Sequence, residues 1–71
     1  RFFYALMVHI GSLIKEEMQR QGRTVPWLAR QICCERRNVY KIYARASIDT
    51  ELLLRISKAL DHDFFRYYSI D

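Results

Sequence analysis

Glycine and proline are scarce in this sequence of 71 residues, which has two glycines and one proline. Their scarcity argues against a flexible linker and against a series of β-hairpins, because hairpin turns favour these residues at regular spacing. It also excludes a glycine-rich loop that would hold nucleotide phosphates. Since 51% of the residues are hydrophobic, we expect one ordered, all-α domain: a compact bundle of four to five helices.

Cysteine occurs only twice, as the adjacent residues Cys33 and Cys34. Neighbouring cysteines almost never bridge each other, because a disulfide needs Cα atoms about 4.4–6.8 Å apart and converging Cβ atoms. We therefore expect reduced thiols and a cytoplasmic protein. A metal site would need the distant His9 and His62, whereas zinc ligands usually come in separated pairs, so we expect no metal. Cys34 is expected to act as a small buried apolar residue.

No hydrophobic run is long enough for a membrane-spanning helix. Residues 1–8, RFFYALMV, form an apolar N-terminal extension, but a span needs about 20 residues and no small-residue cleavage site follows. We therefore expect no membrane role. Two alternatives remain for the extension: Met7 is the true start, or Phe2, Phe3 and Tyr4 pack on the domain or on a partner. Residues 9–71 then form the functional domain.

Positive charge is concentrated in the middle of the chain. The net charge is +4 overall, but residues 20–45 carry seven cations against one carboxylate, a net charge of +6. Residues 1–19 are neutral and residues 46–71 carry −2. This distribution is expected if one face meets a polyanion and the rest is scaffold.

Hydrophobic spacing predicts a first helix from about residue 9 or 10 to residue 21. Apolar residues recur there on one face of a 3.6-residue period: Ile10, Leu13, Ile14 and Met18. Gly22 is placed to end this helix in the left-handed conformation. Thr24 is then expected to cap a second helix, with Pro26 in its first turn and Trp27 in or beside the core.

Three further helices follow from capping residues and apolar spacing. Glu35 lies near the N-cap of the third, which should run to about Ala44. Asp49 is expected to cap the fourth, whose apolar stripe closes the core: Leu53, Ile56 and Leu60. Asp63 can cap a short last helix. We expect Phe64 and Phe65 inside, the tyrosines at the rim, and an aromatic dimer contact shared with Phe2 and Phe3.

The third helix carries the residues that point to function. Its inward anchors are Val39 and Ile42, so five polar or aromatic residues are left for its outer faces: Arg36, Arg37, Asn38, Tyr40 and Lys41. Arginine and lysine attract phosphates, while arginine can pair with guanine and asparagine with adenine through two hydrogen bonds each. These five are our candidates for DNA base contacts. A solvated basic face without a specific partner is the alternative.

The stretch from residue 10 to residue 60 resembles a lambda-repressor-like helix-turn-helix domain of the Cro/repressor, or XRE, type. The features behind the resemblance are the Ile-Gly opening, an apolar residue after the turn, a leucine-rich fourth helix and two apolar pairs: Leu28 with Ala29, and Val39 with Ile42. The sequence departs from the family pattern at three places. Cys33 stands where glycine is frequent, Pro26-Trp27 replaces polar residues, and Val25 replaces a DNA-contacting glutamine.

The resemblance implies a DNA-binding function. It places the start of the second helix, at Thr24 and Val25, near the DNA backbone, and the third helix against bases and phosphates. Arg23, Thr24 and Arg45 are our candidates for phosphate contacts. We therefore expect sequence-specific binding of double-stranded DNA by a transcriptional regulator, acting as a symmetric homodimer on half-sites about 34 Å apart.

An alternative is a protein-interaction module of the same fold, for example in a toxin–antitoxin or phage-related assembly, that does not read DNA. An enzyme is not expected, because His9 and His62 are far apart and no Ser/His/Asp or Cys/His spacing recurs. We accordingly expect no catalytic residue, no cofactor and no small-molecule substrate.

Overall fold

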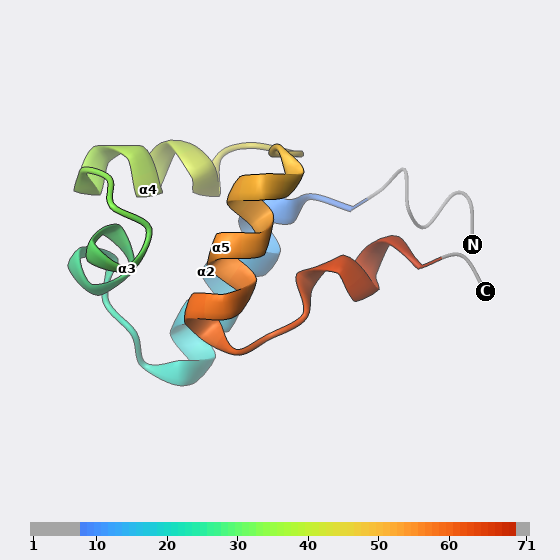
Figure 1. The fold of residues 1–71 in the computed structure, drawn as a ribbon, viewed down its shortest axis with the longest axis horizontal. Coiled ribbons are helices and arrows are strands. Elements are labelled where there is room, and N and C mark those ends of the chain that lie inside the picture. Colours follow the sequence, from blue (N-terminus) through green and yellow to red (C-terminus); the bar gives the residue numbers. More distant parts are fainter. Residues whose placement is uncertain (1–7, 70–71) are drawn as a thin grey trace.

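A computed structural model describes residues 8–69, and all regular elements of this part of the chain are helices (Figure 1). The elements follow one another as α2 (Ile10–Gln21), α3 (Val25–Gln31), α4 (Arg36–Tyr43), α5 (Thr50–Leu60) and the 3-10 helix η1 (Phe64–Tyr68). No strand occurs within residues 8–69. The predicted all-α bundle of four to five helices is confirmed.

Local sequence signals set the helix ends. Gly22 ends α2 with a φ of 70°, in the left-handed region where a side chain would be strained. The side chain of Thr24 accepts a hydrogen bond from the Trp27 amide (3.3 Å), and that of Asp49 accepts one from the Leu52 amide (2.8 Å). The predicted caps of α3 and α5 are thus confirmed. Asp63 caps η1 in the same way, through the Phe65 amide.

A short turn joins α3 to α4. In Figure 1, α3 is seen nearly end-on while α4 lies across the view, so the two helices point in very different directions. The turn depends on Cys33, whose φ of 58° is left-handed. The next residue, Cys34, donates its amide hydrogen to the carbonyl of Ala29 at 2.9 Å. These features give the predicted helix-turn-helix arrangement.

The core fills the space between the helices, since α4 contacts both α2 and α3, and α5 contacts α3 and η1. Its members are aliphatic except for one methionine and one phenylalanine: Ile10, Ile14, Met18, Leu28, Ala29, Ile32, Val39, Ile42, Leu53, Ile56, Leu60 and Phe64. Two predicted core residues are only half-buried. Leu13 lies at the edge of the α2 stripe, and Cys34 faces a surface pocket described below.

The start of α2 is hydrogen-bonded to the segment that follows α4. Ile10 and Gly11 donate their amide hydrogens to the carbonyls of Ala46 and Arg45, at 3.0 and 2.9 Å. These amides belong to the first turn of α2 and have no partner within their own helix. The contact therefore satisfies them and fixes where the chain leaves α4.

The C-terminal aromatics divide differently from the prediction. Phe64 is fully buried, and Tyr67 and Tyr68 are half-buried at the rim, as expected. Phe65 was predicted inside and is 37% exposed, so this prediction was wrong. The 3-10 geometry explains the difference: its three-residue turn places neighbouring side chains about 120° apart, so Phe64 and Phe65 cannot both face the core.

Part of the N-terminal extension lies outside the described residues, including Phe2, Phe3 and Tyr4. Val8, which we assigned to the extension, packs against the core. None of the helices within residues 8–69 has the length and apolarity needed to cross a membrane.

Candidate nucleic-acid interface

The five candidate base-contact residues are all exposed on α4, but they do not share one face. A helix advances about 100° per residue. Arg37, Tyr40 and Lys41 therefore lie on the side away from the buried Val39 and Ile42. The other two candidates, Arg36 and Asn38, lie on opposite flanks. The central three could enter a groove together, whereas the two on the flanks meet different surroundings.

Arg37 is the one cation of α4 that has a carboxylate partner in the described part of the chain. Its Nε lies 2.8 Å from Oε1 of Glu35, and both side chains are more than two-thirds exposed. An exposed pair of this kind contributes only about 0–1 kcal/mol. A phosphate or a guanine could therefore replace Glu35 with little loss. Glu35 occupies the N-cap position of α4 but makes no side-chain cap.

Tyr40 is an exposed aromatic residue on the outer side of α4, with 60% of its surface accessible. Its ring meets the half-buried Tyr43 edge to face, with 6.1 Å between the centroids. Burial raises the pKa of the Tyr43 hydroxyl, and Tyr40 adds to this effect. Tyr43 is thus held neutral and serves as a support for Tyr40.

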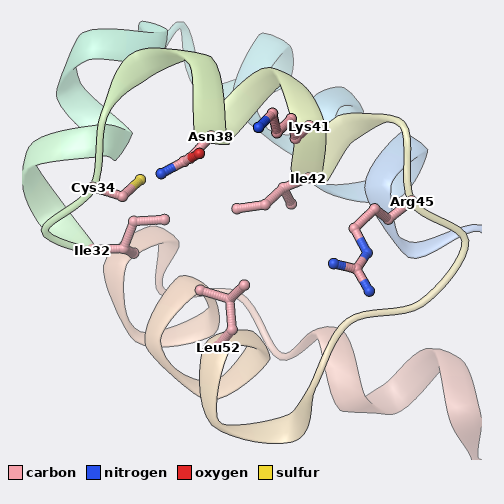
Figure 2. Close-up of a pocket in the computed structure, with 7 residues that line it drawn as sticks. All are labelled: Ile32, Cys34, Asn38, Lys41, Ile42, Arg45 and Leu52. Carbon is pink, nitrogen blue, oxygen red and sulfur yellow. The ribbon is translucent and has the colours of Figure 1, made fainter.

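Asn38, Lys41 and Arg45 line one surface pocket of about 270 Å³, called here the α4 pocket (Figure 2). They fall at i, i+3 and i+7, a spacing that gathers residues on one face of a helix. Ile32 and Leu52 form part of its apolar lining. The structure thus brings together two candidates for base contacts, Asn38 and Lys41, and one candidate for a phosphate contact, Arg45. Asn38 faces this pocket rather than the outermost side of α4.

Arg23 and Thr24 lie apart from α4, at the connection between α2 and α3. The guanidinium carbon of Arg23 lies 4.3 Å from the ring centroid of Trp27. This stacking holds the Arg23 side chain against the protein while it remains exposed. Thr24 uses its hydroxyl oxygen as the cap of α3. Trp27 is half-buried, in agreement with its predicted place at the edge of the core.

Arg30 was not among the candidates from the sequence, yet it lies beside one of them. Arg30 and Arg36 line the same surface hollow between α3 and the start of α4, together with Glu35 and Pro26. Both arginines are exposed, and neither pairs with a carboxylate in the part of the chain described. The only signal for Arg30 in the sequence is its position within the basic stretch of residues 20–45.

The sequence also did not reveal a buried carboxylate, Glu17, and the polar side chains around it. Glu17 is 6% exposed and accepts hydrogen bonds from the guanidinium of Arg20 and from Nε2 of Gln21. Gln21 also donates to the carbonyl of Leu60 at 2.7 Å, and His62 Nδ1 lies 3.7 Å from Glu17 Oε2. These contacts tie α2 to the end of α5. Glu17 continues the apolar stripe three residues after Ile14, and this spacing was the available signal.

The pKa of Glu17 is lowered to about 2, against the effect of its burial. The hydrogen bond from Arg20 is the largest cause, and the bond from Gln21 and the electrostatic effect of the nearby His62 act in the same direction. Glu17 therefore stays ionised at every ordinary pH and acts as a structural anchor rather than a proton donor.

The remaining reactive side chains have structural contacts. His9 caps α2, with its Nδ1 3.2 Å from the Ser12 amide, and Nε2 of His62 bonds the Tyr67 hydroxyl at 2.9 Å. Cys33 and Cys34 are free thiols, and burial raises the pKa of Cys34. Within residues 8–69, no three histidine, cysteine or acidic side chains come close enough to hold a metal ion.

Comparison with protein-family models, with curated proteins and with solved structures gives no match.

Proposed function

We propose that this protein binds double-stranded DNA with α4 in the major groove and acts as a transcriptional regulator of the lambda-repressor-like, XRE type. One observation carries the proposal: four exposed cations on and beside α4 have no carboxylate partner among residues 8–69. They are Arg30, Arg36, Lys41 and Arg45. A cytoplasmic location fits this function and the two free thiols.

Arg37, Tyr40 and Lys41 are the proposed base-contact residues, because they lie on the outermost side of α4. Arg36 and Arg45, on the flanks, would contact the two phosphate strands that border the groove. Asn38 contributes at the edge of the α4 pocket. Arg23, Thr24 and Arg30 add phosphate contacts from α3 and from the turn before it.

Dimer formation is proposed through an apolar patch made by α5, η1 and the connection before α5. Leu54 and Phe65 are 45% and 37% exposed and line a common hollow, while Phe65 also lines a second hollow with Ile48 and Tyr68. We call these four residues the α5 patch. A symmetric dimer formed there would present two copies of α4 to successive major grooves, about 34 Å apart.

The α5 patch also supports the second candidate, a protein-interaction module without DNA readout, as in a toxin–antitoxin or phage-related assembly. An exposed apolar patch marks a partner surface whichever partner covers it. The two functions differ in what α4 does. Only the DNA-binding function requires unpaired cations around that helix.

Salt dependence on duplex DNA separates these functions. If about five phosphates are neutralised, log Kd should rise with log salt concentration with a slope of about 4 to 5, because each contact contributes about 0.9. Selection of binding sites from random duplexes should then yield a consensus with two related half-sites. Salt-independent binding, or no binding at low salt, would eliminate the DNA proposal and leave the interaction module.

A further inference from the structure

The α4 pocket is open to solvent beside α4 and has two chemically distinct parts (Figure 2). Its inner wall is apolar: Ile32 and Ile42 are buried there, while Cys34 and Leu52 are half-buried. The close-up shows Leu52 opposite Ile42, with the Arg45 guanidinium to one side of both. A small hydrocarbon group could therefore contact three elements at once: the turn, α4 and α5.

The rim of the pocket is cationic and lacks a counter-charge. Lys41 and Arg45 are exposed and form no ion pair within the described residues, and no acidic side chain lines the pocket. The side-chain amide of Asn38 also has no hydrogen-bond partner in that part of the chain, and Figure 2 shows it near Cys34 on the same rim. Both charge and hydrogen-bonding groups are thus available to a ligand.

We propose that the α4 pocket binds a small carboxylate with an aromatic or branched hydrocarbon body. The carboxylate would lie between Lys41 and Arg45, where charge-assisted hydrogen bonds form. The hydrocarbon would cover the apolar wall. Pockets that bind small molecules combine an apolar lining with a few polar groups in this way. Either half alone would bind less well, because a bare anion leaves the wall hydrated and a neutral hydrocarbon leaves the cations unpaired.

Pocket volume limits the ligand to a small one. The pocket volume of about 270 Å³ lies just below the range of about 300–1,000 Å³ that is typical of pockets for drug-sized molecules. Benzoate, with about nine non-hydrogen atoms, is a suitable probe, and benzamide has the same shape without the charge. Ligands of this size reach a Kd of about 0.1–1 mM.

Ligand binding would compete with DNA, and this consequence rests on the proposed function. Lys41 and Arg45 are proposed contacts of the duplex, so a carboxylate that neutralises them removes two of the charges that attract it. Linkage then requires DNA to weaken ligand binding by the same factor. The pocket would give a domain of this size a direct response to an organic acid.

The first experiment titrates the ¹⁵N-labelled protein with benzoate and with benzamide and follows amide chemical shifts without DNA. We expect shifts centred on the turn, α4 and the start of α5, and about fivefold to tenfold tighter binding of benzoate, as one ion pair would give. Acetate should bind more weakly than benzoate. Equal binding of benzoate and benzamide, or shifts centred elsewhere, would overturn the proposal.

Two variants test the charges. Lys41→Gln and Arg45→Gln should each lower benzoate affinity toward that of benzamide and leave benzamide binding unchanged. Lys15→Gln is the matched control, because Lys15 is an exposed cation on α2 outside the pocket. Cys34→Leu should fill the pocket and weaken both ligands, with an unchanged amide spectrum elsewhere as evidence of folding. If Lys15→Gln weakens benzoate as much as Arg45→Gln, the binding is unspecific and the proposal fails.

The second experiment measures duplex binding by fluorescence anisotropy while benzoate replaces chloride at constant ionic strength, with acetate as the control. Mass action predicts that the apparent Kd for DNA rises to about twice its value when the benzoate concentration equals the Kd of benzoate. Benzoate binding without any DNA binding would support the pocket and reject the proposed function. DNA binding without benzoate binding would support the proposed function and reject the ligand pocket. If the protein binds both and neither weakens the other, the proposed competition between benzoate and DNA is wrong.

Discussion

Gly11 and Ile42 meet backbone to backbone. A Cβ added to Gly11 would lie 2.3 Å from the carbonyl oxygen of Ile42 and equally close to that of Tyr43. Such an approach brings α2 against the last turn of α4, and the hydrogen bond from the Gly11 amide to the Arg45 carbonyl belongs to the same contact. The position of the proposed recognition helix thus depends on a glycine in the first turn of another helix.

Replacing Gly11 with alanine should destabilise the fold by about 1–3 kcal/mol or more, because backbone atoms cannot yield as a flexible side chain would. Gly22→Ala is the matched comparison, since nothing lies within 4 Å of its added Cβ and only its φ of 70° opposes the change. That strain amounts to about 1 kcal/mol. Urea unfolding measures both variants. A smaller loss for Gly11→Ala than for Gly22→Ala would contradict the close contact.

Cys33→Gly should stabilise the protein. Cys33 is exposed and holds a φ of 58°, a conformation that costs a residue with a side chain about 1–2 kcal/mol and glycine almost nothing. Added freedom in the unfolded chain offsets part of this gain, so we expect about 0.5–1 kcal/mol, or a Tm increase of several degrees. Cys33→Ala, which keeps the strain, should show no increase. An equal gain in both variants would point to the thiol instead.

Acid should weaken the fold through Glu17. The pKa of this carboxyl is about 2 in the folded protein against an ordinary value of 4.5, so its stabilising effect is complete above about pH 4.5. The effect is lost as pH falls from there toward pH 2. Urea unfolding across this range should show a steeper decline for the wild type than for Glu17→Gln. Parallel curves for the two proteins would show that Glu17 does not anchor α2 to α5.

On DNA, Arg37→Ala should cost about 1–3 kcal/mol and relax the preference at one base pair, as expected for a residue that reads a base. Arg30→Ala should instead weaken binding to all sequences equally and reduce the salt slope by about 1. Anisotropy with a selected site and its single-base variants measures both effects. If Arg37→Ala lowers affinity equally on every sequence, Arg37 contacts a phosphate and the readout belongs to Tyr40 and Lys41.

Leu54→Glu should convert a dimer into a monomer with little effect on folding, because Leu54 is 45% exposed and lies in the α5 patch. Sedimentation equilibrium measures the association, and thermal unfolding of the monomer checks the fold. Lys15→Glu, a charge change on the exposed side of α2, is the control and should leave association unchanged. A wild-type monomer at micromolar concentration, both free and on DNA, would exclude the dimer.

Helix ends and the composition of the core could be predicted from the sequence because both depend on local features. Thr24 and Asp49 cap their own helices, Gly22 ends α2 without help from distant residues, and the 3.6-residue period selects Val39 and Ile42 as buried. The all-α bundle follows once these amphipathic helices bury their apolar stripes against each other.

Tertiary structure alone decided how the exposed residues are grouped. Asn38 was assigned a role equal to that of Arg37, yet it faces a pocket completed by Leu52 from α5. Glu17 was not singled out in the sequence, but His62, from the far end of the chain, lies 3.7 Å from its carboxylate. Gln21, which donates a hydrogen bond to Glu17, also donates one to the Leu60 carbonyl. Helix periodicity gives the direction of a side chain, whereas its surroundings depend on which distant element packs there. The sequence by itself determined the helices, and packing determined which of their surfaces can bind.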